Sequence, residues 1–384
     1  MHASRREQRV SRMSARRRRR LTTTIVTAVL LVAAVVAAVV IVRTAATGST
    51  AVASGDQTTH APDTESETPR TPAEALLATT DDPNACVVSF TGDGITNAPA
   101  LQTQGTLYAG LPLPVRDGAV FAGWYTSDAD AQSFTTANRI NGADAVACTD
   151  RQITLHGAWK TPAEVSADNV GVPILMYHQF TTNPAGEDSS LKLNYIYTGD
   201  FDAQMAYLAE QKFYLPTWAE LSAFIDGKLW VPHTSVIITD DDADATWLQL
   251  GVPIIDKYKL LTTSFVITKW RTEPSPSPWV IQRSHTNDMH EAGGNGKGRM
   301  VNWTADQIAA DMETSAQILG AKEVMAYPFG HYNDTAKQGL REAGFEMART
   351  IEPGYVHAGT DKLALPCVRI NYGTTLQEFI NDVG

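Results

Sequence analysis

Cysteine is scarce in this chain, which has three among 384 residues and none in a CxxC spacing. This scarcity excludes a disulfide scaffold and a structural zinc site built from cysteines. Positive charge is also scarce outside the N-terminus: residues 1–20 hold nine Arg and one Glu, whereas the whole chain has a net charge of −11, so the remainder carries about −19. An acidic body excludes a nucleic-acid-binding protein. A hydrophobic content of 43% excludes disorder of the whole chain.

Long apolar runs are absent except at residues 21–42, which carry no charge and follow a run of five Arg. As a helix, these residues span about 33 Å, enough to cross a bilayer core of about 30 Å. We therefore predict a basic cytoplasmic tail at 1–20, a transmembrane anchor at 21–42 and an extracytoplasmic remainder at the cell membrane. The alternative is a signal peptide cleaved near Ala53, which would release a secreted protein. Residues 43–81, rich in Thr, Ala, Ser and Pro, predict a flexible linker.

Short β-type runs separated by turn residues occupy 82–160. The order "VVSFTGDG … LPLPVRDGAVFAGWYT … ITLHGAWK" resembles the internalin B-repeat module, a small β-grasp-like unit. That resemblance implies a spacer or an adhesive module with a possible surface partner. Cys86 and Cys148 bracket this module, and in an oxidising compartment we predict that they form a disulfide. In the chain-entropy model this bond would stabilise the folded state by about 4 kcal/mol. The alternative is two small buried apolar residues, which is also our expectation for Cys367.

Residues 169–384 alternate between strand-like and helix-like segments. Capping boxes, Thr217 with Glu220 and Thr304 with Gln307, each predict the start of a helix. Repeated β-then-α units predict an α/β fold with a parallel sheet, plausibly a barrel. The expected strands are 172–177, 235–239, 263–268 and 323–327, and the other expected helices are 201–213, 247–258 and 335–343.

Carboxylates and imidazoles follow three of the apolar runs, where a barrel would have its active site. Asp240-Asp241-Asp242 follows one run, His285 and His290 follow another, and His178 follows a third. These are the ligand types of a catalytic zinc with one open position. On a helix, two histidines five residues apart would lie about 140° apart, so His285 and His290 can share a metal only if residues 286–289 form a loop.

The motifs "VPILMYHQF", "VIITDDDAD", "TTSFVITKW", "RSHTNDMH" and "AYPFGHYN" resemble the polysaccharide deacetylase (NodB homology) family, carbohydrate esterase family 4. They are most similar to the poly-N-acetylglucosamine deacetylases. The resemblance implies a distorted (β/α) barrel over 169–384, preceded by the transmembrane helix, the linker and the β-grasp-like module. It also implies a metal-dependent hydrolase that removes N-acetyl groups from an N-acetylglucosamine-containing cell-surface polysaccharide or peptidoglycan.

Carried over by position, the resemblance implies Asp241 as the general base and His178 as the general acid. It implies Asp242, His285 and His290 as the ligands of a divalent metal. We expect Zn²⁺ at this site, although cobalt, nickel or iron could occupy the same ligands.

The third motif implies that Tyr327, Pro328 and Phe329 line the substrate groove, with an oxyanion donor among the backbone N–H groups near Tyr327. Trp218, Trp230, Trp270 and Trp279 are candidates for stacking on sugars, for which core packing is the default expectation. The Gly-rich segment 293–299 is a candidate substrate-edge loop, although a flexible surface loop is favoured.

Four departures from the family pattern are visible. Asp240 stands where the family has Phe, Ala243 where it has Gly, and Ala326 where it has an Arg that orients the base. The family's C-terminal His motif is missing, since no His lies beyond His357. The alternatives therefore include a glycan O-acetyl esterase of the same fold, and a catalytically silent surface adhesion or carbohydrate-binding protein.

Overall fold

The computed structural model describes residues 70–188, 190 and 192–384. The described residues fall within one compact unit. The predicted cytoplasmic tail, transmembrane anchor and most of the predicted linker lie outside the described residues. Within the described ranges, none of the helices combines the length and the apolar character needed to cross a membrane.

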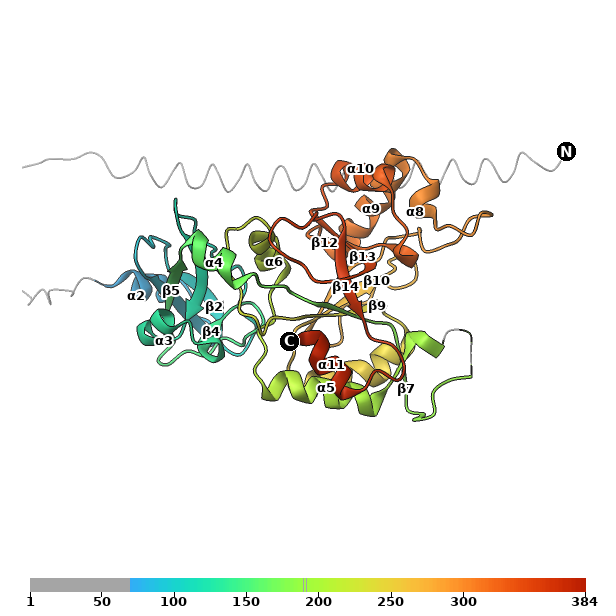
Figure 1. Ribbon diagram of the computed structural model, residues 1–384. Helices are drawn as coiled ribbons and strands as arrows, with labels where there is room; N and C mark the ends of the chain where they lie inside the picture. The colour runs from blue at the N-terminus through green and yellow to red at the C-terminus, as the bar shows by residue number, and fades with distance from the viewer. Residues whose placement is uncertain (1–69, 189, 191) are drawn as a thin grey trace, which may run out of the picture. The chain divides into compact units, whose positions relative to one another are not determined.

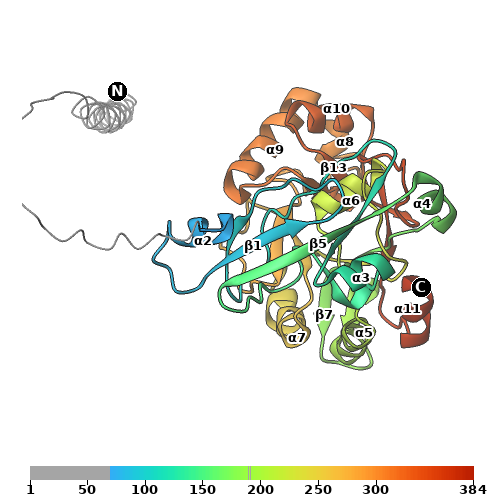
Figure 2. The same ribbon diagram turned by 90° about the vertical axis from the view of Figure 1, so that its left-hand side faces the viewer.

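The first sheet has five strands in the order β2-β1-β5-β3-β4, with β1 and β5 paired in parallel and the other pairs antiparallel (Figure 2). The predicted disulfide is confirmed: Cys86 in β1 is bonded to Cys148, with their Cα atoms 6.1 Å apart. The strands are β1 (Ala85–Thr91), β2 (Ala100–Thr103), β3 (Val120–Tyr125), β4 (Arg139–Ile140) and β5 (Gln152–Lys160).

The second sheet is a closed barrel of seven strands in the order β10-β11-β12-β13-β14-β6-β9, and every neighbouring pair is parallel (Figure 1). The α/β barrel expected from the alternating segments is therefore present. The strands are β6 (Ile174–Tyr177), β9 (Ile237–Asp242), β10 (Thr262–Val266), β11 (Val280–Ser284), β12 (Val324–Ala326), β13 (Met347–Pro353) and β14 (Leu365–Arg369). A separate parallel pair is formed by β7 (Gln179–Thr181) and β8 (Tyr195–Tyr197).

Helices connect and cover the strands, and both predicted capping boxes are present. Thr217 accepts a hydrogen bond from the Glu220 amide, and Thr304 accepts one from the Gln307 amide. The helices are α2 (Pro72–Leu77), α3 (Asp128–Ser133), α4 (Pro162–Asp168), α5 (Thr198–Glu210), α6 (Trp218–Ile225), α7 (Val252–Tyr258), α8 (Arg299–Asn302), α9 (Ala305–Leu319), α10 (Asp334–Glu342) and α11 (Leu376–Val383).

Two elements differ from the expectation. The predicted helix 247–258 is divided into a π-helical turn, Trp247–Gly251, and α7. The predicted strand 235–239 begins later and extends through the aspartates, so that β9 ends at Asp242. Asp240 is paired with β6 on one side and β10 on the other, and Asp241 is paired with β10, so both lie inside the sheet although aspartate has a low intrinsic preference for strands.

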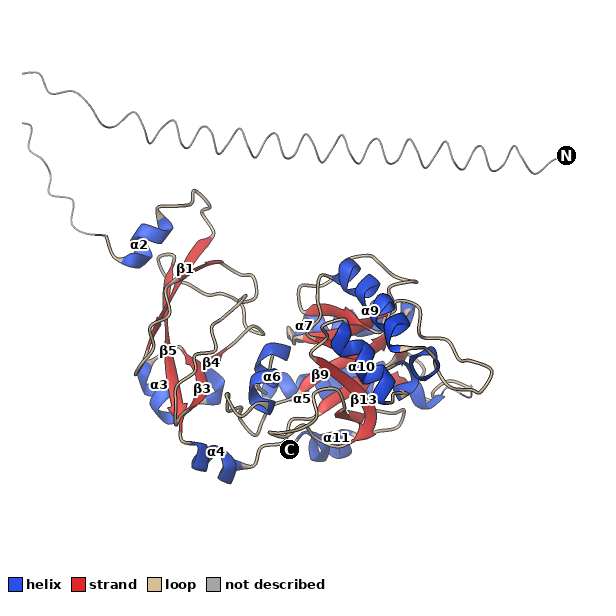
Figure 3. Ribbon diagram, turned by 90° about the horizontal axis from the view of Figure 1, so that it is seen from above, coloured by secondary structure: helices blue, strands red, loops and turns tan. Residues whose placement is uncertain are grey.

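The five-stranded sheet and the barrel share one hydrophobic core. Phe121 and Trp124 of β3 belong to the same buried cluster as Leu221 of α6 and Ile174 inside the barrel. Helix α6 lies between the two sheets (Figure 3). The Phe121 amide donates to the Lys228 carbonyl (3.1 Å), and the Phe121 carbonyl accepts a hydrogen bond from the Trp230 amide (2.8 Å).

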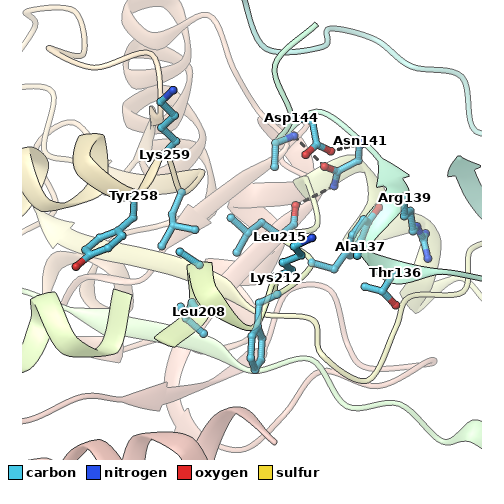
Figure 4. A pocket seen from close by; sticks show the side chains of 15 residues that line it. Thr136, Ala137, Arg139, Asn141, Asp144, Leu208, Lys212, Leu215, Tyr258 and Lys259 are labelled. Carbon is cyan, nitrogen blue, oxygen red and sulfur yellow. Dashed lines mark hydrogen bonds between the residues drawn. The ribbon is translucent and has the colours of Figure 1, made fainter. Parts of the chain in front are cut away.

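Buried polar groups also join the two parts. The Asn141 side-chain amide donates to the Leu215 carbonyl (2.8 Å) and to Glu220 Oε2 (2.7 Å), and its backbone amide donates to Asp144 Oδ2 (2.9 Å). Asn141, Asp144 and Leu215 line a cavity of about 230 Å³ (Figure 4), and none of the predicted catalytic residues lines it. Burial, assisted by the charge of Glu220, raises the pKa of Asp144 to about 6.

The raised pKa of Asp144 predicts a pH-dependent stability. An unfolded Asp titrates near pH 3.9, so the folded state holds the proton more tightly. The resulting stabilisation is complete below about pH 4 and is lost as the pH rises through about 6. We expect Asp144→Asn to remove this dependence, so that the variant gains on the order of 1 kcal/mol relative to the wild type between pH 4.5 and 7. Urea unfolding across this range measures the difference, with the exposed Asp117→Asn as the control. A difference between Asp144→Asn and wild type that does not vary with pH would contradict the prediction.

Candidate metal centre

Three of the predicted side chains converge at the carboxyl ends of β9 and β11. Asp242 Oδ1 lies 3.3 Å from His285 Nε2 and 3.2 Å from His290 Nε2. One ligand atom from each of the three residues falls within 4.8 Å of the others. His285 is almost fully buried, whereas His290 and Asp242 are partly accessible, so the cluster is open on one side.

The donor atoms fit a divalent cation. Asp242 Oδ1 is buried and has no hydrogen-bond partner among the described residues. The other nitrogen of His285, Nδ1, lies 2.9 Å from the Ala326 carbonyl oxygen, which can only accept. The Nδ1–H must donate there, so the Nε2 lone pair is left facing Asp242, as in histidine ligands of zinc.

The segment between the two histidines is a loop, which is the condition under which they can share a metal. Thr286 has a left-handed φ of 72°, which turns the chain directly after His285. The buried carboxylate of Asp311, on α9, accepts hydrogen bonds from the amides of Asn287 and Asp288, each at 2.8 Å. Asp311 therefore holds this loop in position, a role that its place in the middle of a helix gave no reason to expect.

Asp241 lies beside the cluster, between the charged Arg349 and the titratable His178. Its Oδ1 contacts the guanidinium of Arg349, and its Oδ2 is 3.6 Å from His178 Nε2. Burial alone would raise the pKa of Asp241, but the charges of Arg349 and His178 outweigh it, so its pKa lies below the usual range. The carboxylate is therefore ionised at neutral pH and able to accept a proton.

Arg349 was missed by the sequence analysis. It lies in β13, is fully buried, and also donates to the Met176 sulfur (2.8 Å) and the Thr350 carbonyl (3.1 Å). The only sequence signal was a single positive charge in the otherwise mostly apolar segment "FEMARTI". In the family pattern an arginine at the position of Ala326 orients the base. Here Arg349, from a different strand, contacts Asp241 instead.

Asp240, the additional carboxylate, is fully buried, and its Oδ2 accepts a hydrogen bond from Ser264 (3.3 Å). Burial raises its pKa well above the usual range, with the negative charge of Asp241 acting in the same direction. Burial and the neighbouring charge of Asp241 therefore favour the protonated, uncharged form of Asp240. Ala243, in place of the usual Gly, adopts a left-handed φ of 51° directly after Asp242.

The three predicted groove residues are placed differently. Tyr327 is buried, and its hydroxyl donates to the Leu363 carbonyl (3.0 Å), so its side chain belongs to the core rather than to the groove. Pro328 is also buried. Phe329 has a left-handed φ of 59°, is 40% exposed, and its ring centroid lies 4.4 Å from that of His290. Of these three residues, only Phe329 is exposed beside the metal cluster.

Residues 230–348 match the family model described as polysaccharide deacetylase. This part of the chain is therefore of the polysaccharide deacetylase type. The matched segment contains Asp242, His285 and His290, whereas His178 and Arg349 lie outside it.

Individual deacetylases show the same relationship. Over 223 residues the chain is 25% identical to the putative polysaccharide deacetylase YxkH of Bacillus subtilis, covering 54% of this chain and 74% of the relative. Over 162 residues it is 26% identical to the poly-beta-1,6-N-acetyl-D-glucosamine N-deacetylase of Staphylococcus aureus, covering 36% of this chain and 56% of the relative.

Two solved structures also match part of the chain. The Streptococcus pyogenes deacetylase PplD matches with a TM-score of 0.48 and 21% identity, covering 56% of this chain and 99% of that chain. IcaB from Ammonifex degensii matches with a TM-score of 0.47 and 21% identity, covering 56% of this chain and 97% of that chain.

Proposed function

We propose that this protein is a zinc-dependent hydrolase that removes N-acetyl groups from an N-acetylglucosamine-containing polysaccharide of the cell surface. The observation that carries the proposal is the convergence of Asp242, His285 and His290, with one buried oxygen that has no other partner, in a deacetylase domain. The similarity to a poly-N-acetylglucosamine deacetylase supports this class of substrate.

A bound Zn²⁺ would supply Lewis-acid activation of a water molecule and of the acetyl carbonyl group. We assign proton abstraction to Asp241, because it is ionised, held by Arg349 and adjacent to the metal ligand Asp242. We assign proton donation to the leaving amine to His178, 3.6 Å from Asp241. Burial lowers the pKa of His178, which makes its protonated form a stronger acid.

A backbone donor for the oxyanion can be assigned by elimination. The Tyr327 amide donates to the Arg349 carbonyl (3.0 Å) as part of the barrel, and Pro328 has no amide hydrogen. The next amide, that of Phe329, belongs to the residue that turns outward beside His290. We therefore assign the Phe329 N–H to the oxyanion in place of an amide nearer Tyr327.

We also propose that the domain works outside the cytoplasm. The Cys86–Cys148 disulfide supports this location, since such bonds persist in oxidising compartments and are rare in the cytosol. The apolar run 21–42 would anchor the chain, with cleavage near Ala53 as the alternative; both lie outside the described residues.

The test is acetate release from N-acetylglucosamine oligomers by the full chain, with zinc and with a chelator, alongside metal stoichiometry. We expect about one zinc per chain, loss of acetate release on chelation, and recovery when zinc is restored. His290→Ala should lose both zinc and activity, whereas the exposed His233→Ala should retain both. Activity that survives chelation, or release from O-acetylated but not N-acetylated sugars, would contradict the proposal.

A further inference from the structure

One tryptophan differs from the others in its surroundings. Trp270, in the turn that follows β10, is 63% exposed. Trp124, Trp218, Trp230 and Trp247 are each less than 9% exposed, as expected for large apolar side chains in a core. Packing therefore does not account for Trp270, and the default expectation for this residue does not hold.

The exposed ring lies beside the metal cluster. The Trp270 ring centroid is 6.1 Å from that of His290, and Phe329 is 4.4 Å from the same imidazole. The two most exposed aromatic side chains near the cluster thus border one metal ligand, although they come from different strand ends. His331 extends this aromatic surface, 5.8 Å from Phe329.

The segment that carries Trp270 is fastened to the loop that carries His290. The Thr268 and Lys269 amides donate to the Thr286 and Asn287 carbonyls, at 3.1 and 3.2 Å. The Lys269 ammonium group lies 2.7 Å from an oxygen of Asp288. Trp270 therefore keeps its place relative to the metal ligand, as a preorganised binding residue must.

Phe329 is held from the other direction by the Gly-rich segment. A Cβ atom at Gly298 would lie 3.0 Å from a Phe329 ring carbon, so glycine permits this close approach. The Gly298 amide donates to His331 Nδ1 (3.1 Å), and the Gly293 amide donates to the Lys297 carbonyl (2.8 Å). The segment is thus a hydrogen-bonded turn packed on Phe329, rather than the loose surface loop that was favoured from the sequence.

We propose that Trp270 and Phe329 form a stacking subsite for a sugar unit of the polymer next to the unit that loses its acetyl group. The faces of a pyranose ring carry C–H groups, which pack on the electron-rich faces of aromatic rings. This inference rests on the proposed function, and it makes chain length a determinant of specificity, because a monosaccharide cannot fill both positions.

The test compares N-acetylglucosamine oligomers of one to five units with the full chain. In the wild type, kcat/KM should rise with oligomer length. In Trp270→Ala the ratio of kcat/KM for the pentamer to kcat/KM for the monomer should fall about tenfold, the equivalent of one well-packed aromatic contact. Trp270→Phe should recover most of the ratio. Ile318→Ala, which truncates an exposed apolar side chain on α9, should leave the ratio unchanged.

Binding without turnover separates this inference from the proposed function. In an Asp241→Asn background, calorimetry should show pentamer binding that weakens about tenfold on Trp270→Ala. If turnover requires zinc and Asp241 but neither the length ratio nor pentamer binding depends on Trp270, the subsite is wrong and the function stands. If no acetate is released but pentamer binding depends on Trp270, the subsite stands and the function is wrong.

Discussion

Asp241→Asn is expected to lower kcat for acetate release by about 10²–10⁴-fold while zinc remains bound, which is the range for loss of a general base. Asn has nearly the shape of Asp and can still accept the hydrogen bond from Arg349, but it cannot take a proton. The metal ligands Asp242, His285 and His290 are unchanged. Acetate release and zinc content, measured on the same samples, check both parts of the prediction.

The matched control is Asp202→Asn, which removes an exposed carboxylate paired with Lys257 on the outside of the barrel. It should keep both zinc and activity. Near-normal turnover by Asp241→Asn would exclude Asp241 as the base. Loss of zinc from Asp241→Asn would instead make this residue part of the metal site and would contradict the separation of roles between Asp241 and Asp242.

Arg349→Met is expected to lower the free energy of unfolding by about 3–5 kcal/mol, the range for breaking a buried ion pair by removing one partner. Met approximates the length of the Arg side chain, so the main change is that the buried carboxylate of Asp241 loses its positive partner. Activity should fall as well, since the pKa of Asp241 would rise and its orientation would no longer be fixed. Urea unfolding and acetate release measure the two effects.

The double variant Asp241→Asn/Arg349→Met tests the cause. Removing the charge from both partners leaves no unpaired buried charge, so the double variant should be more stable than Arg349→Met alone. If the two substitutions simply add, the loss in Arg349→Met arises from packing and the ion pair is not what stabilises this part of the barrel.

Local patterns predicted much of the barrel. A capping box such as Thr217 with Glu220 operates within one helical turn, so four residues suffice to place a helix start. Apolar runs indicated the parallel strands because strands covered on both faces have no polar side. Strand ends of a parallel barrel meet at one edge, which brought the three aspartates and the histidines into one hypothesis. The resemblance to the deacetylase family then singled out Asp242, His285 and His290 as ligands.

Features that depend on distant contacts were not predictable. Arg349 lies 108 residues after Asp241, and no local pattern links the two. Tyr327 and Phe329 are neighbours in one motif, but a hydrogen bond to Leu363 and a left-handed backbone turn direct them to opposite environments. Trp270 could not be distinguished from buried tryptophans, because its exposure follows from tertiary structure and not from its neighbours in sequence.

The core shared by the five-stranded sheet and the barrel affects how this protein can be divided. Removing residues 70–168 would leave Leu221, Phe224 and Trp218 of α6 facing water and would separate Glu220 from its partner Asn141. A fragment that begins at the first barrel strand would thus expose an apolar surface and would be prone to aggregate. For expression, domain exchange or ancestral comparison, the smallest portable piece of this enzyme includes both sheets.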